Sequence, residues 1–135
     1  MATLTPTLTL NSTDAFSDVV NFSITDTLTT KAPSQSLSTI VATTTGNENI
    51  IVAANDNKQT WVFIRHTGKA ADGTTDTTNH CDIEITGDVA AGTLKPNEFC
   101  FFPFCGNGAS KGVQLQAVSA SVTMEYAYWS DNTGQ

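Results

Sequence analysis

Threonine and aliphatic residues alternate one by one along much of this chain, and this alternation limits the fold more than any other feature. Leu4, Leu8 and Leu10 stand at even positions with Thr between them, and a second stretch of the same period runs from Val20 to Leu28. A period of two residues predicts half-buried β-strands, because successive side chains of a strand point to opposite faces. Thr makes up 23 of the 135 residues, and its branched Cβ suits strands better than helices.

Segments of this kind recur between turns rich in Gly, Pro, Asn and Asp. The sequence predicts an all-β protein, an antiparallel β-sandwich with a jelly-roll-like arrangement of eight to nine short strands and an N-terminal extended arm. The expected strands are residues 4–10, 20–28, 37–44, 50–52, 60–66, 81–86, 99–102, 113–117 and 122–128.

The length of 135 residues indicates one sandwich domain. We expect residues 12–135 to form it, and residues 1–11 to form an arm or an edge strand. Pro6 lacks an N–H donor, which assigns this segment to a sheet edge or to a neighbouring molecule. Pro33 to Gln35 is expected to break the chain before the strand that starts at Leu37.

The charge of the chain argues against two classes of partner. With 13 acidic and 6 basic side chains, the net charge is -7. Nucleic-acid affinity depends on Lys and Arg that neutralise phosphates, and an anionic membrane surface also attracts cations, so we expect neither partner. The first ten residues lack the pattern of a secretory signal, and no apolar window is long enough to span a membrane. We therefore expect the product to stay in the compartment where it is made.

The three cysteines, Cys81, Cys100 and Cys105, are an odd number without the spacing of a disulfide framework, so free thiols are expected. Together with His80 they form a conceivable zinc set. However, adjacent residues such as His80 and Cys81 point to opposite faces of a strand, and the spacing of the other two is loose. The sequence therefore predicts no metal site at these residues.

No residue pattern specifies a reaction. A metal-dependent cupin requires several converging histidines, whereas this chain has only His66 and His80. The polar loop at 69–79 lacks the Asp-x-Asp spacing of a calcium loop, although it contains Asp72, Asp76 and Asn79. We expect no catalytic residues and no cofactor.

The last third of the chain carries a rhythm that resembles a known family. It consists of LKPNEF at 94–99, FFPF at 101–104, VQLQA at 113–117 and MEYAY at 124–128. This succession resembles the closing strands of small jelly-roll virion proteins of tailed bacteriophages, particularly the structural and capsid-decoration (cement) proteins of phages that infect cyanobacteria. Such proteins often have Pro-Gly-Glu at the turn. Asn97 replaces the Gly here, and Asn enters the left-handed region more readily than most residues.

The resemblance implies a non-enzymatic protein that is assembled in the host cytoplasm and carried on the capsid surface of the virion. Its implied partners are the major capsid protein and further copies of itself, as a homotrimer or another homo-oligomer. The implied binding mechanism is burial of apolar surface together with strand addition by a terminal arm.

Two groups of apolar residues are candidates for such an interface. The arm offers Leu4, Leu8 and Leu10. The second group follows from the alternation of a strand, because neighbouring side chains point to opposite faces. One core therefore does not bury all three of Phe101, Phe102 and Phe104. Either a second molecule covers one face, or the strand is central and covered on both faces. Trp129 after the last expected strand is either a cap on the end of the sandwich or an interface anchor. The candidates of this second group are Phe101, Phe102, Phe104 and Trp129.

An alternative function uses the same fold. A receptor- or carbohydrate-binding jelly-roll module of a phage tail or fibre would present exposed aromatic platforms between Asn- and Asp-rich loops. Copy number separates the two functions, because a decoration protein covers the shell and a receptor-binding module occurs a few times at the tail.

Overall fold

The computed structural model describes residues 2–15, 17–45, 49–53, 59–86, 89–106 and 111–131. In these ranges the chain consists of strands and turns without any helix, and the strand pairs whose register is resolved are antiparallel, which confirms the all-β expectation. Over the same ranges, nothing helical is long and apolar enough to cross a membrane. The chain divides into two compact units, Met1–Lys31 and Ala32–Gln135.

The first unit is a small all-strand structure. It contains β1 (Ala2–Leu4), β2 (Thr7–Ser12), β3 (Val20–Thr25) and the first residues of β4 (Leu28–Ala42). β2 and β3 form a two-stranded antiparallel hairpin, and β1 pairs with the start of β4. The division between the units therefore follows Lys31 rather than residue 11, because the expected arm is joined by hydrogen bonds to the next strands of the chain.

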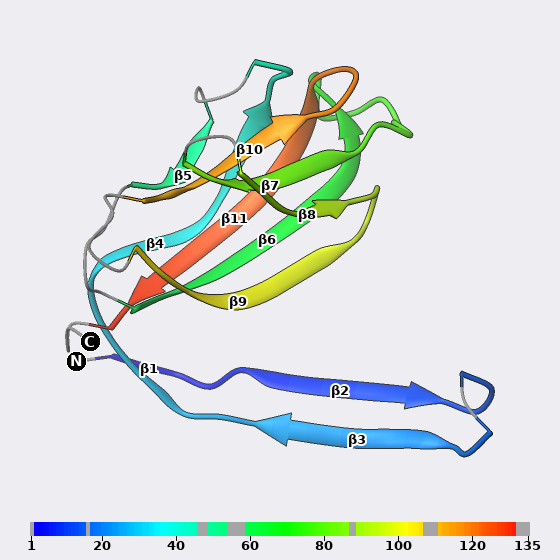
Figure 1. Ribbon diagram of the computed structural model, residues 1–135, viewed down its shortest axis with the longest axis vertical. Coiled ribbons are helices and arrows are strands. Elements are labelled where there is room, and N and C mark those ends of the chain that lie inside the picture. The colour runs from blue at the N-terminus through cyan, green and yellow to red at the C-terminus, as the bar shows by residue number, and fades with distance from the viewer. Residues whose placement is uncertain are drawn as a thin grey trace. The chain divides into compact units, whose positions relative to one another are not determined.

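The second unit contains the rest of β4 and seven further strands. They are β5 (Ile50–Val52), β6 (Gln59–Ala70), β7 (Cys81–Ile85), β8 (Val89–Leu94), β9 (Phe99–Cys105), β10 (Val113–Ala117) and β11 (Val122–Ser130). One sheet has the order β4-β11-β6-β9 and the other has the order β5-β10-β7-β8. Figure 1 shows the second sheet lying over the first. Only the β7–β8 connection joins neighbours in one sheet among these described strands, and each other connection passes from one sheet to the other.

One hydrophobic cluster joins the two sheets. The alternation in β6 turns Val62 and Ile64 inward, where both are fully buried, and Leu115 of β10 and Met124 of β11 meet them in the same cluster. Every strand of the second unit contributes to this cluster. The apolar residues at every second position therefore bind the two sheets to each other, as the sequence pattern predicts.

Three sequence predictions need correction. β4 runs without a break from Leu28 to Ala42, so residues 33–35 do not interrupt it. In the second unit β4 is the outermost strand of its sheet, a position where a missing N–H donor is tolerated. Trp129 lies inside β11 rather than after it. β9 is an edge strand, which removes the alternative that its Phe residues belong to a central strand.

The turn before β9 depends on two residues in the left-handed region. Asn97 has a φ of 71°, as its replacement of Gly predicts, and Gly68 of β6 has a φ of 77°. The Asn97 N–H donates to the His66 carbonyl at 3.0 Å, and the His66 N–H donates to the Glu98 carbonyl at 2.9 Å. A Cβ on Gly68 would lie 2.7 Å from Asn97 Oδ1. The turn and β6 therefore approach each other closely, and Gly68 permits the approach.

Replacement of Gly68 by Ala should lower the free energy of unfolding by about 1–3 kcal/mol, because a left-handed φ is costly for a residue with a Cβ and the new methyl group displaces Asn97. Gly73→Ala is the matched control, since Gly73 has a φ of 72° and no atom within 4 Å of an added Cβ. It should show the conformational cost alone, about 1 kcal/mol. Urea unfolding of both variants measures the difference, and equal losses would contradict the importance of the close approach.

Candidate interaction surfaces

The β2–β3 hairpin presents an apolar face that no residue of its own unit covers completely. Leu8 lies opposite Ile24, and Leu10 lies opposite Phe22. Their exposed fractions are 50% for Leu8, 46% for Leu10, 41% for Phe22 and 62% for Ile24. Alternation places these four side chains on one face of the hairpin, and we call this set the hairpin face.

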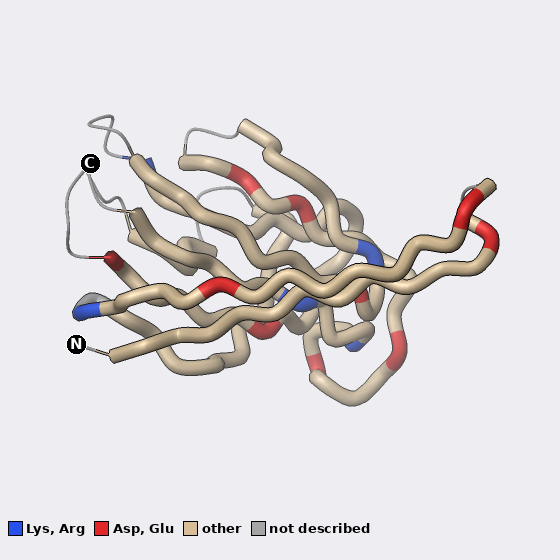
Figure 2. Tube along the Cα trace, turned by 90° about the horizontal axis from the view of Figure 1, so that it is seen from below, with Lys and Arg blue, Asp and Glu red and all other residues tan. Residues whose placement is uncertain are grey.

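The opposite face of the hairpin is polar. The Thr7 and Thr25 hydroxyls are hydrogen-bonded at 2.9 Å, and those of Thr9 and Ser23 at 3.1 Å. Figure 2 shows that the strands of this unit are largely uncharged, with acidic residues at the hairpin end. The charged residues described in this unit are Asp14, Asp18, Asp26 and Lys31. The hairpin is therefore amphipathic, with no charge on its apolar face.

An amphipathic two-stranded hairpin is marginally stable alone in water. Complete burial of a Leu, Ile or Phe side chain contributes about 1.5–3 kcal/mol, so covering four half-exposed ones contributes about 3–6 kcal/mol. The hairpin face is therefore a surface that gains substantial free energy when another apolar surface covers it.

The outer face of the β4-β11-β6-β9 sheet is aromatic. In β6 the side chains of Trp61 and Phe63 point away from the core, opposite to Val62 and Ile64. On the neighbouring β9, Phe101 pairs with Phe63 and Phe99 pairs with Arg65. Phe99 is 64% exposed and Phe101 is 37% exposed.

Ring contacts join three aromatic side chains of this sheet face into a strip. The rings of Trp61 and Phe101 stack with centroids 5.9 Å apart and planes 11° apart, and Trp129 of β11 meets Phe101 at 6.5 Å with a tilt of 56°. At the end of the strip beside Phe99, Arg65 forms an ion pair with Glu125 at 3.3 Å. We call the set Trp61, Phe63, Phe99, Phe101 and Trp129 the aromatic face. Exposed aromatic surface of this kind is typical of interaction sites.

The outer face of the other sheet is different in character. Its strands β7 and β10 carry Asp82, Glu84, Gln114 and Gln116 at the positions that point away from the core. The Gln114 Nε2 donates to Glu84 Oε2 at 2.8 Å. Glu84 and Gln114 are buried, and the exposed Ile50 of β5 pairs with Gln114, so this face combines buried polar pairs with a single exposed aliphatic residue at β5 rather than an aromatic cluster.

The seven interface residues predicted from the sequence separate into four groups. Leu8 and Leu10 lie on the hairpin face, whereas Leu4 is half-buried in β1 opposite Leu28. Phe101 and Trp129 lie on the aromatic face, and Phe102 and Phe104 pack into the core of the second unit.

Sequence reasoning missed the other members of these faces, notably Phe22, Ile24 and Phe99. Phe22 and Ile24 belong to the alternating stretch at 20–28, whose period predicts a half-buried strand but not what covers its apolar face. The signal that indicates their exposure is the pairing of β3 with β2, because this sheet contains only these two strands.

The histidines and cysteines are not arranged for metal binding. In the described ranges, no three His, Cys, Asp or Glu side chains gather into a group that would hold a metal ion. Burial raises the pKa of the Cys81 thiol to about 12, with the nearby charge of Asp82 acting in the same direction, and burial raises the pKa of Cys100 to about 11. These thiols therefore remain protonated at neutral pH, where a protonated thiol is a poor nucleophile.

His66 is held by the backbone. The Gly68 N–H donates to Nδ1 at 3.0 Å, so Nε2 carries the proton and donates to the Asn79 carbonyl at 3.0 Å. Burial lowers the pKa of His66, with His80 acting in the same direction, against the opposing effects of the Asn79 carbonyl and Glu98. The ring is a neutral structural link between β6 and the loop that precedes β7.

The loop between β6 and β7 binds its carboxylates through hydrogen bonds and an ion pair within this part of the chain. Asp72 Oδ1 accepts the N–H groups of Thr74 and Thr75, and its Oδ2 accepts the Thr75 hydroxyl at 2.6 Å. These bonds, the one from the Thr75 hydroxyl above all, hold the pKa of Asp72 below its usual range. The Asp76 carboxylate pairs with Lys69 Nζ at 2.5 Å. Both carboxylates are therefore engaged by protein donors.

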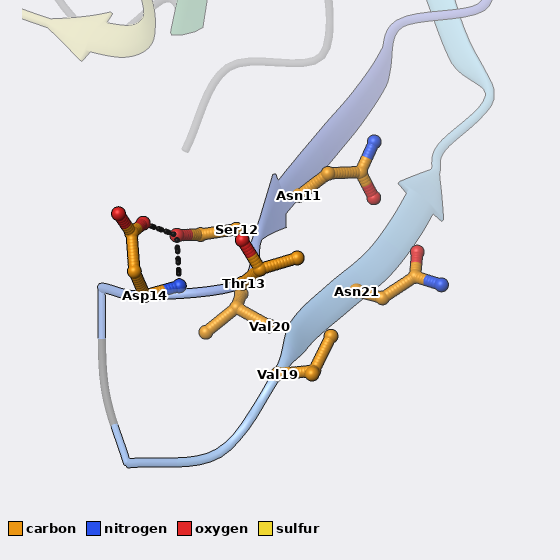
Figure 3. Close-up of a pocket in the computed structure, with 7 residues that line it drawn as sticks. All are labelled: Asn11, Ser12, Thr13, Asp14, Val19, Val20 and Asn21. Atoms are coloured by element: carbon orange, nitrogen blue, oxygen red, sulfur yellow. Dashed lines mark hydrogen bonds between the residues drawn. The ribbon is translucent and has the colours of Figure 1, made fainter.

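An open recess of about 580 Å³ lies at the end of the hairpin. Figure 3 shows Ser12 beside Asp14, with Asn11 and Asn21 along the strands. The Ser12 hydroxyl donates to Asp14 Oδ1 at 3.1 Å and accepts the N–H of Ala15 at 2.9 Å. These are bonds that form the turn of the hairpin, and Asp14 is the one ionisable residue among the described residues that line the recess.

No protein-family model, curated protein or solved structure matches this chain. Function therefore has to be inferred from the two apolar faces and the strand arrangement.

Acidification should destabilise the chain through His66. The unfolded imidazole has a pKa of 6.5, and burial lowers the pKa of the folded one. Below about pH 6.5 the unfolded state therefore binds more protons than the folded state. As the pH is lowered further, the free energy of unfolding decreases by at most ~1.4 kcal/mol per pH unit for this single proton. Above that pH this contribution is fully present.

Urea unfolding between about pH 7.5 and pH 5.5 measures this dependence. His66→Gln should flatten the curve, and His80→Gln should leave most of the slope in place. A slope that is unchanged in His66→Gln would contradict the assignment.

Proposed function

We propose that this chain is a phage virion structural protein, a capsid decoration (cement) protein that stabilises the shell by binding between capsid subunits. Its partner is the major capsid protein, and its working form is a homotrimer or another homo-oligomer. It assembles in the host cytoplasm and ends on the capsid surface of the virion, without catalytic, nucleic-acid-binding or membrane activity.

The strand order supports the architecture on which this proposal rests. Eight described strands, β4 to β11, form two four-stranded antiparallel sheets that share one core. The orders β4-β11-β6-β9 and β5-β10-β7-β8, with all successive strands except β7 and β8 crossing between sheets, are those expected of an eight-stranded jelly-roll β-sandwich. This is the fold that the resemblance of the last third of the chain implies.

The observation that carries the proposal is the pair of apolar faces left over by the core. The hairpin face and the aromatic face both present large apolar side chains to solvent. A monomer gains nothing from such surfaces, whereas a protein that binds other subunits buries them.

The size of the hairpin face explains why several copies would act together. Its burial contributes about 3–6 kcal/mol, and association of two proteins costs about 4–15 kcal/mol in lost freedom. One hairpin contact is therefore weak alone. Repetition in an oligomer, or addition of the aromatic face, makes the sum favourable.

The stacked Trp61–Phe101 pair favours a second candidate function. Flat aromatic pairs on a sheet face also bind sugar rings, so a receptor- or carbohydrate-binding module of a tail or fibre remains the alternative. It would need only a few copies in each particle.

Quantitative mass spectrometry of purified particles that contain this chain tests both functions. For a decoration protein we expect a molar ratio to the major capsid protein within a small factor of one, since the sites repeat over the shell. A ratio hundreds of times smaller, together with specific hits on a glycan array, would replace the proposal with the tail module.

The hairpin face is tested by a double variant. Leu8→Ser with Ile24→Ser removes one cross-strand pair of the hairpin face, and we expect at least about a tenfold loss of retention on particles, corresponding to about 1.4 kcal/mol or more. The far-ultraviolet circular dichroism should keep its β-sheet signal, because the core of the second unit contains neither residue.

The matched control is Thr9→Ala with Ser23→Ala, which removes a pair of the same register on the polar face. It should retain binding to particles. Equal retention of both double variants would refute the role of the hairpin face.

A further inference from the structure

An apolar crevice lies inside the second unit, between the edge strands β8 and β9. Its volume is about 370 Å³, and the residues that line it include Ile83, Gly92, Leu94, Cys100 and Phe102. β8 and β9 are consecutive in the chain but belong to different sheets, and each is the last strand of its sheet. The crevice therefore enters the space between the two sheets from their common edge.

Gly92 creates this space. It pairs with Ile83, a core residue, so its position also faces the core, and its neighbour at the next inward position, Leu94, is buried. The backbone of Gly92 lies outside the left-handed region, and an added Cβ would meet no atom within 4 Å. Neither backbone conformation nor crowding requires a glycine here, although glycine weakens a strand. The pairing of β8 with β7 changes register beside Gly92, and glycine in a strand marks either such an irregularity or the close approach of another group. The missing side chain leaves room for such a group.

The chemistry of the lining selects the ligand. None of the residues that line the crevice carries a charge. The Thr93 hydroxyl donates to Asp82 Oδ1 at 2.5 Å. Burial raises the pKa of the Cys100 thiol, so it stays neutral. A charged or strongly polar ligand would lose hydrogen bonds to water that the crevice does not replace. An apolar ligand makes no such hydrogen bonds. The volume lies in the range of small-molecule sites, and cavities with such walls bind small hydrocarbons.

We propose that the crevice between β8 and β9, opened by Gly92 and walled by Ile83, Leu94, Cys100 and Phe102, binds one small uncharged apolar ligand or the end of an alkyl chain. This site is separate from the hairpin face and the aromatic face, and it goes beyond the function proposed above. Its occupation does not require a capsid partner, so it is testable on the isolated chain.

The test uses the full chain with methyl-labelled Ile and Leu, titrated in nuclear magnetic resonance with two probes. Benzene represents a free apolar molecule, and decanoate represents an acyl chain whose carboxylate stays in water. We expect saturable shifts of the Ile83 and Leu94 methyl signals with at least one probe. Shifts with benzene alone identify a small-molecule site, and shifts with decanoate identify an alkyl-chain site.

Two variants that add the same side chain give the control. Gly92→Leu places it in the crevice and should weaken probe binding at least about tenfold. Val89→Leu places it at an exposed position of the same strand that does not line the crevice, and this variant should bind like the original chain. Gly92→Val serves the same purpose as Gly92→Leu with a smaller, β-branched side chain if the larger residue prevents folding.

Two results would overturn the proposal. The first is the absence of saturable methyl shifts with either probe in the original chain. The second is undiminished binding in folded Gly92→Leu or Gly92→Val. Neither result depends on particles, so failure here leaves the proposed decoration function to its own test.

Discussion

Every strand has two faces, and the shared core of this protein has room for only one face of each strand. β6 illustrates the constraint: Val62 and Ile64 enter the core, and Trp61 and Phe63 must therefore point outward. The same reasoning applies to β9, where Phe102 and Phe104 enter the core and Phe99 and Phe101 do not. The apolar side chains that these strands turn away from the core form the exposed apolar surface of the second unit.

The exposed apolar side chains are distributed unevenly over the outer faces of the strands, and the proposed function rests on this distribution. The outer face of β7 and β10 is polar, whereas the outer face of β6 and β9 is aromatic. In the first unit, the two-stranded hairpin has no second layer in its own unit. The hairpin face and the aromatic face are thus separate from the polar side chains of β7 and β10.

The sequence predicted strands and their faces well, because a period of two residues determines which side chains share a face. It also predicted the left-handed Asn97, since the turn pattern required such a residue. The sequence did not predict which strands pair with each other or which strand faces are covered. The pairing of β3 with β2 leaves Phe22 and Ile24 exposed, and Glu84 is buried although it points to the opposite face from the core residue Ile83. Alternation gives no information on which strand lies beside another or on what covers a face.

The β2–β3 hairpin also bears on how the protein avoids faulty association before it meets a partner. A two-stranded sheet exposes unpaired strand edges, which tend to recruit identical edges from other molecules. Pro6 withholds one backbone donor immediately before β2, and the acidic residues Asp14, Asp18 and Asp26 give every hairpin the same sign of charge. Like charges keep newly made copies apart in solution. The hairpin therefore combines an exposed apolar face with features that oppose stacking of identical strand edges.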